Sequence, residues 1–115
     1  MVTNVTSLTG NGLKDWLIQR ITAIYFAVYL LLLFIFFIFH SHLSYNQWHN
    51  LCANQCFKIA TMIAFLALTL HSWIGIWTVT TDYIKCAKLR IGTQLLVLFW
   101  LLSQFFWGVM IFWGL

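Results

Sequence analysis

The sequence has very few charged residues for its length. Only 7% of its 115 residues are Asp, Glu, Lys or Arg, and glutamate does not occur. Soluble domains carry about 25% charged residues, so this composition excludes a surface that faces water on all sides. Proline is also absent, so nothing in the sequence demands a sharp helix kink. The chain is therefore expected to be an integral membrane protein.

The usual motifs of soluble enzymes and nucleic-acid-binding proteins are missing as well. The chain has no glycine-rich phosphate loop, no C-x-x-C pair and no Ser-His-Asp pattern. Its three cysteines make an odd count without paired spacing, which predicts no disulfide framework. Its six basic residues are too few, and lie too close to the ends of apolar runs, to indicate a nucleic-acid partner.

Most of the chain consists of long apolar runs. The sequence is 63% hydrophobic and its mean hydropathy is +0.90. Each run exceeds the roughly 17 residues that a helix needs to cross the hydrocarbon layer. We predict an all-α integral membrane fold with three transmembrane helices in a single domain, 1–115. The predicted spans are residues 16–39, 58–80 and 91–114, joined by polar connections at 40–56 and 81–90.

The basic residues concentrate at one side of the predicted spans. They flank the start of the first span and crowd the connection 81–90, whereas the connection 40–56 is followed by a single lysine, Lys58. Loops rich in Lys and Arg stay on the cytoplasmic side, so we predict a cytoplasmic N-terminus and a C-terminus outside. The residues that set this orientation are Lys14, Arg20, Lys85, Lys88 and Arg90.

His71 lies near the middle of the second span, where an ionisable side chain is costly unless it is paired or used. Three roles are open: a neutral imidazole bonded to a neighbouring helix, a proton relay, or a ligand of haem iron. A relay usually recruits carboxylates at similar depth, and none occurs there. Gly75 lies one turn further along the same face. A glycine there would let a flat macrocycle lie against the helix, or equally admit a neighbouring helix.

The other histidines do not provide a second ligand to the same iron. His40, His42 and His49 belong to the outer end of the first span and its connection. His71 should lie some 15 Å deeper, at about 1.5 Å per residue. If His71 binds a low-spin haem, the second axial ligand must therefore come from another chain.

The segment "HNLCANQC" places His49, Cys52 and Cys56 within reach of one another. Structural metal sites need four ligands in tetrahedral geometry, and this spacing matches no standard pattern. We therefore expect loop cysteines of no special role. A Cys52–Cys56 disulfide on the outer face stays open.

Two segments resemble a known family. "GNGLKDWLIQRITAIYFAVY" at the first span and "HSWIGIWTVTTDYIK" at the second are similar to the smaller of the two hydrophobic membrane anchor subunits of bacterial succinate dehydrogenase, which is respiratory complex II. The specific pattern is a histidine, then Trp-x-Gly-x-Trp, then Asp-Tyr eleven residues after the histidine. The likeness covers the whole chain. Cys86 is one departure, since many relatives have a proline there.

The resemblance implies a non-flavin subunit of a larger enzyme, with no complete active site in this chain. A flavoprotein subunit would oxidise succinate, an iron–sulfur subunit would carry the electrons, and a second hydrophobic cytochrome b subunit would complete the anchor in the bacterial inner membrane. The resemblance also implies a b-type haem shared between the two anchors, with His71 as an axial ligand of its iron, and a ubiquinone site to which Tyr83 donates a hydrogen bond.

Two further residues are candidates near these sites. Asp82 is eleven residues from His71, close to three helical turns, so it should lie on nearly the same face about 16 Å nearer the cytoplasm. We place it near the quinone site; the alternative is a helix-terminal or docking charge. Arg20 could bind a haem propionate, because its fork matches a carboxylate, or serve only to set topology.

Rival functions fit the sequence less well. A small multidrug transporter has similar length but needs four spans and a buried glutamate, whereas this chain has three predicted spans and no glutamate. A purely structural membrane peptide would make His71 and Asp82 accidental. The anchor of a fumarate reductase is a nearer alternative, because such enzymes run the same redox chemistry in reverse.

Overall fold

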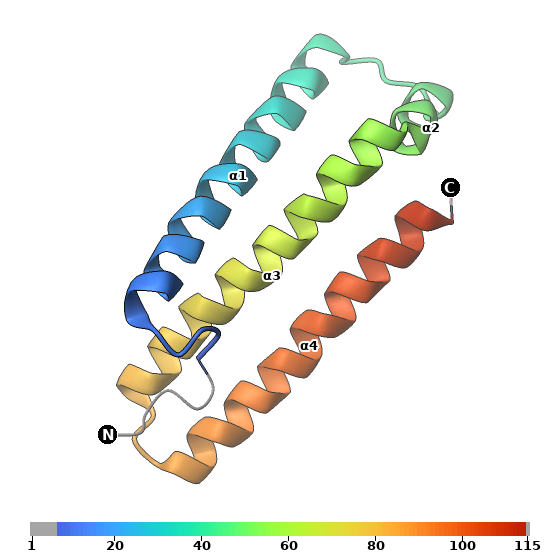
Figure 1. Cartoon of the computed structure of the whole chain (residues 1–115). Helices are drawn as coiled ribbons and strands as arrows, with labels where there is room; N and C mark the ends of the chain where they lie inside the picture. The colour runs from blue at the N-terminus through green and yellow to red at the C-terminus, as the bar shows by residue number, and fades with distance from the viewer. Residues whose placement is uncertain (1–6, 115) are drawn as a thin grey trace.

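In the computed structural model, residues 7–114 are described, and they form four helices (Figure 1). Residues 1–6 of the polar N-terminal segment and residue 115 lie outside the described range. Three of the helices are long and apolar enough to cross a membrane, so the predicted all-α fold with three long apolar helices is confirmed. The four helices are α1 (Gly12–Phe39), α2 (Tyr45–Ala53), α3 (Gln55–Tyr83) and α4 (Ala87–Trp113).

The helices are longer than the apolar runs from which they were predicted. α3 continues three residues past the predicted end of the second span, and α4 begins four residues before the predicted third span. The connection between them is therefore only residues 84–86. Helix propagation requires no apolar side chain, so polar residues next to a span extend the helix at little cost.

α2 is a short helix inside the polar segment that was expected to be only a connection. Ser44 and Gln47 form a capping box at its start: Gln47 N–H donates to Ser44 Oγ at 3.2 Å, and Ser44 N–H donates to Gln47 Oε1 at 3.0 Å. This reciprocal pair satisfies two backbone donors that would otherwise lack partners. The Trp48 ring then packs against Phe37 of α1, with ring centroids 5.4 Å apart.

The start of α1 is fixed by the residues just before it. Asn11 caps the helix, because its side-chain oxygen accepts from the backbone N–H groups of Leu13 and Lys14. Gly10 precedes the cap with φ = 73°, a left-handed conformation that favours glycine. The carboxylate of Asp15, which is buried, accepts hydrogen bonds from the backbone N–H and the hydroxyl of Thr9.

α3 lies between α1 and α4 and contacts both (Figure 1). Small side chains on α3, Thr61, Ala64 and Ala67, are buried, which allows a close approach of neighbouring helices as is common in membranes. Two tyrosines of α1 add polar links: Tyr25 O–H donates to the carbonyl of Ala60 at 2.8 Å, and Tyr29 Oη lies 2.7 Å from Thr61 Oγ1. These bonds fix the register of α1 against α3.

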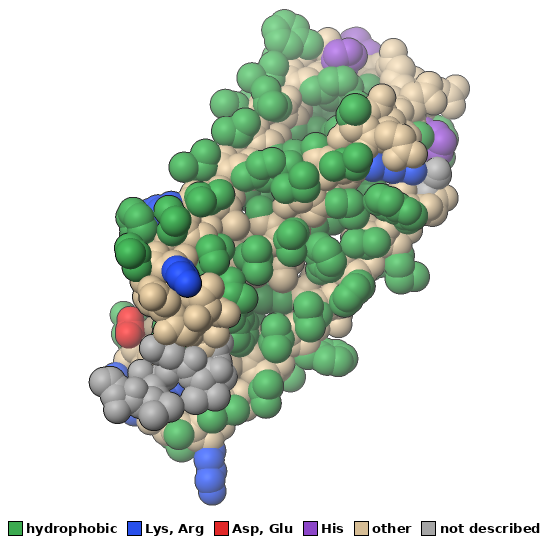
Figure 2. Space-filling view, in the orientation of Figure 1, with side chains coloured by type: hydrophobic (Ala, Val, Ile, Leu, Met, Phe, Trp, Pro, Cys, Tyr) green, Lys and Arg blue, Asp and Glu red, His purple; other side chains and the backbone are tan. Residues whose placement is uncertain are grey.

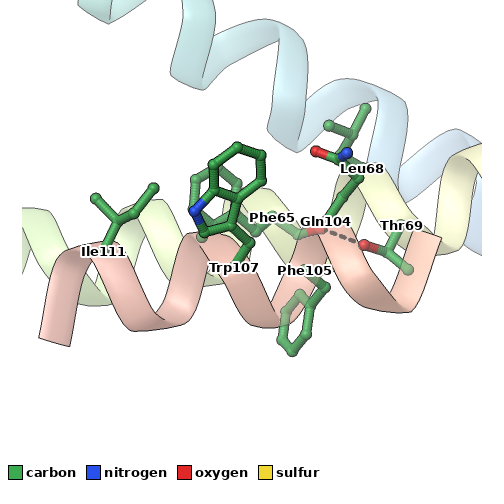
Figure 3. Close-up of a pocket in the computed structure, with 8 residues that line it drawn as sticks. Phe65, Leu68, Thr69, Gln104, Phe105, Trp107 and Ile111 are labelled. Carbon is green, nitrogen blue, oxygen red and sulfur yellow. Dashed lines mark hydrogen bonds between the residues drawn. The ribbon is translucent and has the colours of Figure 1, made fainter. Parts of the chain in front are cut away.

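The contact between α3 and α4 uses a glycine and a buried lysine. Gly108 packs so closely under the ring of Phe65 that a Cβ at this position would overlap the ring. Beside this pair lies an apolar cavity of about 290 Å³, whose other lining residues include Trp107 and Ile111 (Figure 3). Lys58 is buried against the end of α4, with Nζ 5.8 Å from the centroid of the Trp113 ring.

The outer surface is hydrophobic along its length. Large apolar side chains of α1 and α4 are exposed over most of both helices, and Figure 2 shows hydrophobic side chains spread along the length of the visible face. The histidines in this view lie toward the end of the molecule near α2. Such a surface suits lipid and the helices of other membrane subunits, since water would disfavour an exposed apolar area of this size.

Candidate functional site

His71 lies in the middle of α3, on the face that packs against α1. Its ring is half-buried, and Nδ1 lies 3.2 Å from the backbone carbonyl oxygen of Gln19 and 3.5 Å from Thr22 Oγ1. The carbonyl oxygen of Gln19 is an acceptor only, so it favours the tautomer that carries its hydrogen on Nδ1. One ring nitrogen of His71 thus contacts the neighbouring helix α1, an arrangement compatible with a bonded imidazole and with a metal ligand alike.

Gly75 lies one turn beyond His71 and faces the same neighbouring helix. A Cβ at this position would sit 3.5 Å from Nε2 of Gln19, which is an ordinary contact. α1 therefore does not require glycine here. Packing against α1 thus does not decide between the two roles of Gly75, a place for a flat macrocycle or for a neighbouring helix.

Asp82 and Tyr83 lie at the C-terminal end of α3. The helix is continuous from His71 to both residues, so the spacing places Asp82 on nearly the same face as His71, about 16 Å along the axis. Both side chains are exposed, Tyr83 to 80%. A phenol and a carboxylate therefore stand next to each other at the edge of the span, open to a ligand or to another subunit.

Arg20 is exposed on α1, one residue after Gln19. Its guanidinium carbon lies 5.4 Å from the centroid of the Trp16 ring, a cation–π geometry. The tryptophan holds the charge at the end of the span where α1 begins. Arg20 thus follows Gln19, whose carbonyl contacts His71, but these contacts do not join Arg20 itself to His71.

The sequence of the chain matches the profile of a family described as the succinate dehydrogenase/fumarate reductase transmembrane subunit, over residues 6–111. The chain belongs to this family. It is 37% identical over 109 residues to the succinate dehydrogenase hydrophobic membrane anchor subunit of Coxiella burnetii, with 95% of each chain covered. It is 30% identical over 88 residues to the subunits of the same name from Rickettsia prowazekii and Rickettsia typhi, covering 74% of this chain and 68% of each relative.

This membership confirms the resemblance drawn from the two span segments. The long coverage of the Coxiella burnetii relative extends it over nearly the whole chain. The protein is thus a multi-pass membrane anchor of the succinate dehydrogenase family, and α1, α3 and α4 are its apolar helices.

The histidines and cysteines of the segment 40–56 are not gathered into one cluster in the described part of the chain. Among residues 7–114, no group of three or more His, Cys, Asp or Glu side chains is placed to hold a metal ion. Cys52, Cys56 and Cys86 are free thiols. Cys52 is buried in α2, and burial raises the pKa of its thiol, while Cys56 is exposed.

Two polar groups near the site were missed by sequence reasoning. Asp15 lines a cavity of about 320 Å³ between the start of α1 and α3, together with Asn11, Gln19 and Trp77. The sequence feature that could have drawn attention to Asp15 is its place as an acidic residue in the first helical turn after the N-cap Asn11. Gln94 of α4 is fully buried against α3. Because it is a single glutamine within an apolar run, the sequence does not predict which residue it contacts.

Proposed function

We propose that this chain is the hydrophobic anchor of a bacterial succinate:ubiquinone oxidoreductase, in which His71 ligates a b-type haem and Tyr83 binds ubiquinone. The single observation that carries the haem part is the contact of His71 Nδ1 with the Gln19 carbonyl at 3.2 Å. A ring that donates from Nδ1 keeps the lone pair of Nε2 free for iron, which is the usual arrangement of a metal-binding histidine. The ring therefore fits the group that the family implies.

The partner subunits are those that the family of this chain implies. Among residues 7–114, the other histidines and cysteines lie toward the two ends of α3, whereas His71 lies in its middle, so the other axial ligand would come from a second cytochrome b anchor. The soluble part would be an iron–sulfur subunit and a flavoprotein. A bound haem would supply a one-electron carrier inside the membrane. We assign Arg20 to a haem propionate, because its guanidinium is exposed near the Gln19 level of α1.

The quinone part of the proposal rests on the end of α3. Ubiquinone reduction takes two electrons and two protons, so its site must meet lipid on one side and water on the other. Tyr83 stands at such a boundary, and its hydroxyl can donate to a quinone carbonyl and stabilise negative charge as electrons arrive. Asp82 would orient groups in the proton path or tune their pKa, without touching the quinone itself.

We place the N-terminus and the α3–α4 connection on the cytoplasmic side of the bacterial inner membrane. The start of α1 and the α3–α4 connection lie at the same end of the molecule (Figure 1), and both segments carry basic residues, as the positive-inside rule requires of a cytoplasmic end. The iron–sulfur protein would dock there beside Asp82 and Tyr83. The relatives are named for succinate dehydrogenase, which favours succinate oxidation over fumarate reduction.

The test of this function is the spectrum of the assembled complex. The chain is co-expressed with the neighbouring subunits, purified, and recorded as a reduced-minus-oxidised difference spectrum. We expect a b-type signal that His71→Leu abolishes or alters while the soluble subunits still co-purify. His42→Leu, a change in the outer segment, is the matched control and should leave the signal intact. An unchanged spectrum in His71→Leu contradicts the haem assignment.

A further inference from the structure

The side chain of Thr22 in α1 lies within hydrogen-bonding distance of Nδ1 of His71. It is only 7% exposed, and its Oγ1 lies 3.5 Å from His71 Nδ1. The hydroxyl also lies 2.8 Å from the carbonyl oxygen of Ile18 and 3.1 Å from that of Gln19. A buried threonine hydroxyl thus lies in the contact between α1 and α3.

The other hydrogen bonds of Thr22 determine whether its hydroxyl donates to His71 or accepts from it. Thr22 has one hydroxyl proton, and the short contact to Ile18 uses it. The oxygen lone pairs of Thr22 then remain to face the ring, so toward His71 the hydroxyl is an acceptor. The Gln19 carbonyl is an acceptor as well. The Nδ1–H group of a neutral His71 therefore meets two acceptors from adjacent turns of α1.

Two acceptors constrain the ring more than one. A single carbonyl leaves the imidazole free to rotate about the axis of its hydrogen bond, whereas a second oxygen on one side removes part of this freedom. Hydrogen bonds from the distal N–H also make an imidazole a stronger electron donor through its other nitrogen. A stronger donor stabilises the oxidised form of a bound metal relative to the reduced form.

We propose that Thr22 is a positioning residue for His71: its hydroxyl, with the Gln19 carbonyl, holds Nδ1–H toward α1 and presents Nε2 as a strong, oriented metal ligand. This inference rests on the proposed function of His71. It adds a residue on another helix whose role is to set the redox potential and the orientation of the ligand. Thr22 acts through His71 and touches no substrate.

The experiment compares three variants in the purified complex with all its subunits. Thr22→Val keeps the shape of the side chain and removes the acceptor. Thr22→Ser keeps the hydroxyl and removes the methyl group. Thr69→Val is the matched control, because the Thr69 hydroxyl donates only to the Phe65 carbonyl of its own helix. The readouts are the midpoint potential of the haem, its low-temperature electron paramagnetic resonance spectrum and its rate of loss in detergent.

The expected result separates the two hydroxyls. Thr22→Val should raise the midpoint potential, shift the resonance spectrum and weaken haem retention by on the order of tenfold or more, while Thr69→Val should match the wild type. Thr22→Ser should restore the wild-type potential. If Thr22→Val assembles no haem, Thr22→Ala replaces it, and a shifted potential in Ala but not in Ser supports the role.

The opposite results overturn the inference without touching the proposed function. A Thr22→Val complex with the wild-type potential and spectrum shows that the hydroxyl does not act on His71. Equal shifts in Thr22→Ser and Thr22→Val assign the effect to packing of the methyl group. Failure of the proposed function itself would look different, because His71→Leu would then keep the full b-type spectrum.

Discussion

Nε2 of Gln94 donates a hydrogen bond to Thr80 Oγ1 at 2.8 Å and so joins α4 to α3 inside the apolar layer. The direction of this bond is fixed, because the Thr80 hydroxyl donates to the Ile76 carbonyl at 2.8 Å and can only accept from Gln94. Gln94 has no exposed surface, and its Oε1 has no hydrogen-bond partner among the described residues. The pair is thus a single buried bond with one acceptor left over.

The Gln94–Thr80 bond predicts a non-additive pair of substitutions. Thr80→Val leaves both polar atoms of Gln94 without partners, so it should destabilise the complex more than the double variant Thr80→Val/Gln94→Leu, in which no polar group is stranded. Coupling within membrane helices averages about 0.6 kcal/mol, and a double-mutant cycle of detergent unfolding measures it. Thr78→Val is the control, since that hydroxyl donates only to Ile74. Additive effects would falsify the coupling.

Tyr83→Phe should separate two activities of the complex. The phenol is exposed at the end of α3, so its loss should leave the fold intact and remove one hydrogen bond to the quinone. Removing a donor to developing negative charge costs on the order of 10²-fold in rate in favourable cases. We expect a large loss of succinate:quinone activity with little change in succinate oxidation by a soluble dye. An equal loss in both assays would assign Tyr83 to assembly instead.

The native cysteines report the orientation of the helices. Cys56 at the start of α3 and Cys86 before α4 are both exposed, at opposite ends of α3. An impermeant maleimide should therefore label Cys56 from the outside of intact cells, and Cys86 only in inverted vesicles of the anchor stripped of its soluble subunits. Cys56→Ser and Cys86→Ser identify each signal. Labelling of Cys86 from outside would reverse the proposed orientation.

Cys52 should differ from Cys56 in its dependence on pH. The thiolate is the reactive form, and burial raises the pKa of Cys52, so less thiolate is present at any given pH. Labelling of Cys52 should stay slow near neutrality and increase only as the pH rises toward the raised pKa. Rate measurements from neutral pH upward in a variant with Cys52 alone test this, and rapid labelling at neutral pH would contradict the buried position in α2.

Gly108 and Gly92 of the same helix should respond oppositely to alanine. A Cβ at Gly108 would overlap the Phe65 ring, whereas a Cβ at Gly92 meets nothing within 4 Å. Gly108→Ala should destabilise the α3–α4 pair by about 1–3 kcal/mol, the usual cost of overpacking. Gly92→Ala should be neutral or stabilise the helix by up to about 1 kcal/mol. Adding Phe65→Leu should restore part of the loss at Gly108, as measured by thermal release of the anchor from the complex.

The long helices could be predicted because membrane spans depend on composition and length alone. The common face of His71 and Asp82 was predictable for the same reason, since a continuous helix fixes it by spacing. α2 was missed, although Ser44 and Gln47 three residues apart are a known start signal. The low hydropathy of that segment hid the signal, because a short polar helix contains no long apolar run.

Contacts between helices were the part that sequence could not supply. No pattern in the sequence predicts the contacts of Gln94 with Thr80, of Thr22 with His71, or of Lys58 with Trp113 that the structure shows. Each pair joins residues of two helices whose relative rotation is set by packing. Gly75 illustrates the limit, because a small residue fits a macrocycle and a helix equally well. The roles of Arg20, Asp82 and Tyr83 stay predictions for the same reason.

The composition of the segment from His40 to Phe57, which contains α2, affects how the chain inserts into the membrane. It holds no Lys, Arg, Asp or Glu, yet in the proposed orientation it is the part of the chain that must be carried across the bilayer as α1 and α3 insert. Lys58, which follows the segment directly, is then the one formally charged residue that crosses with it, while the lysines that follow α3 stay on the side of synthesis.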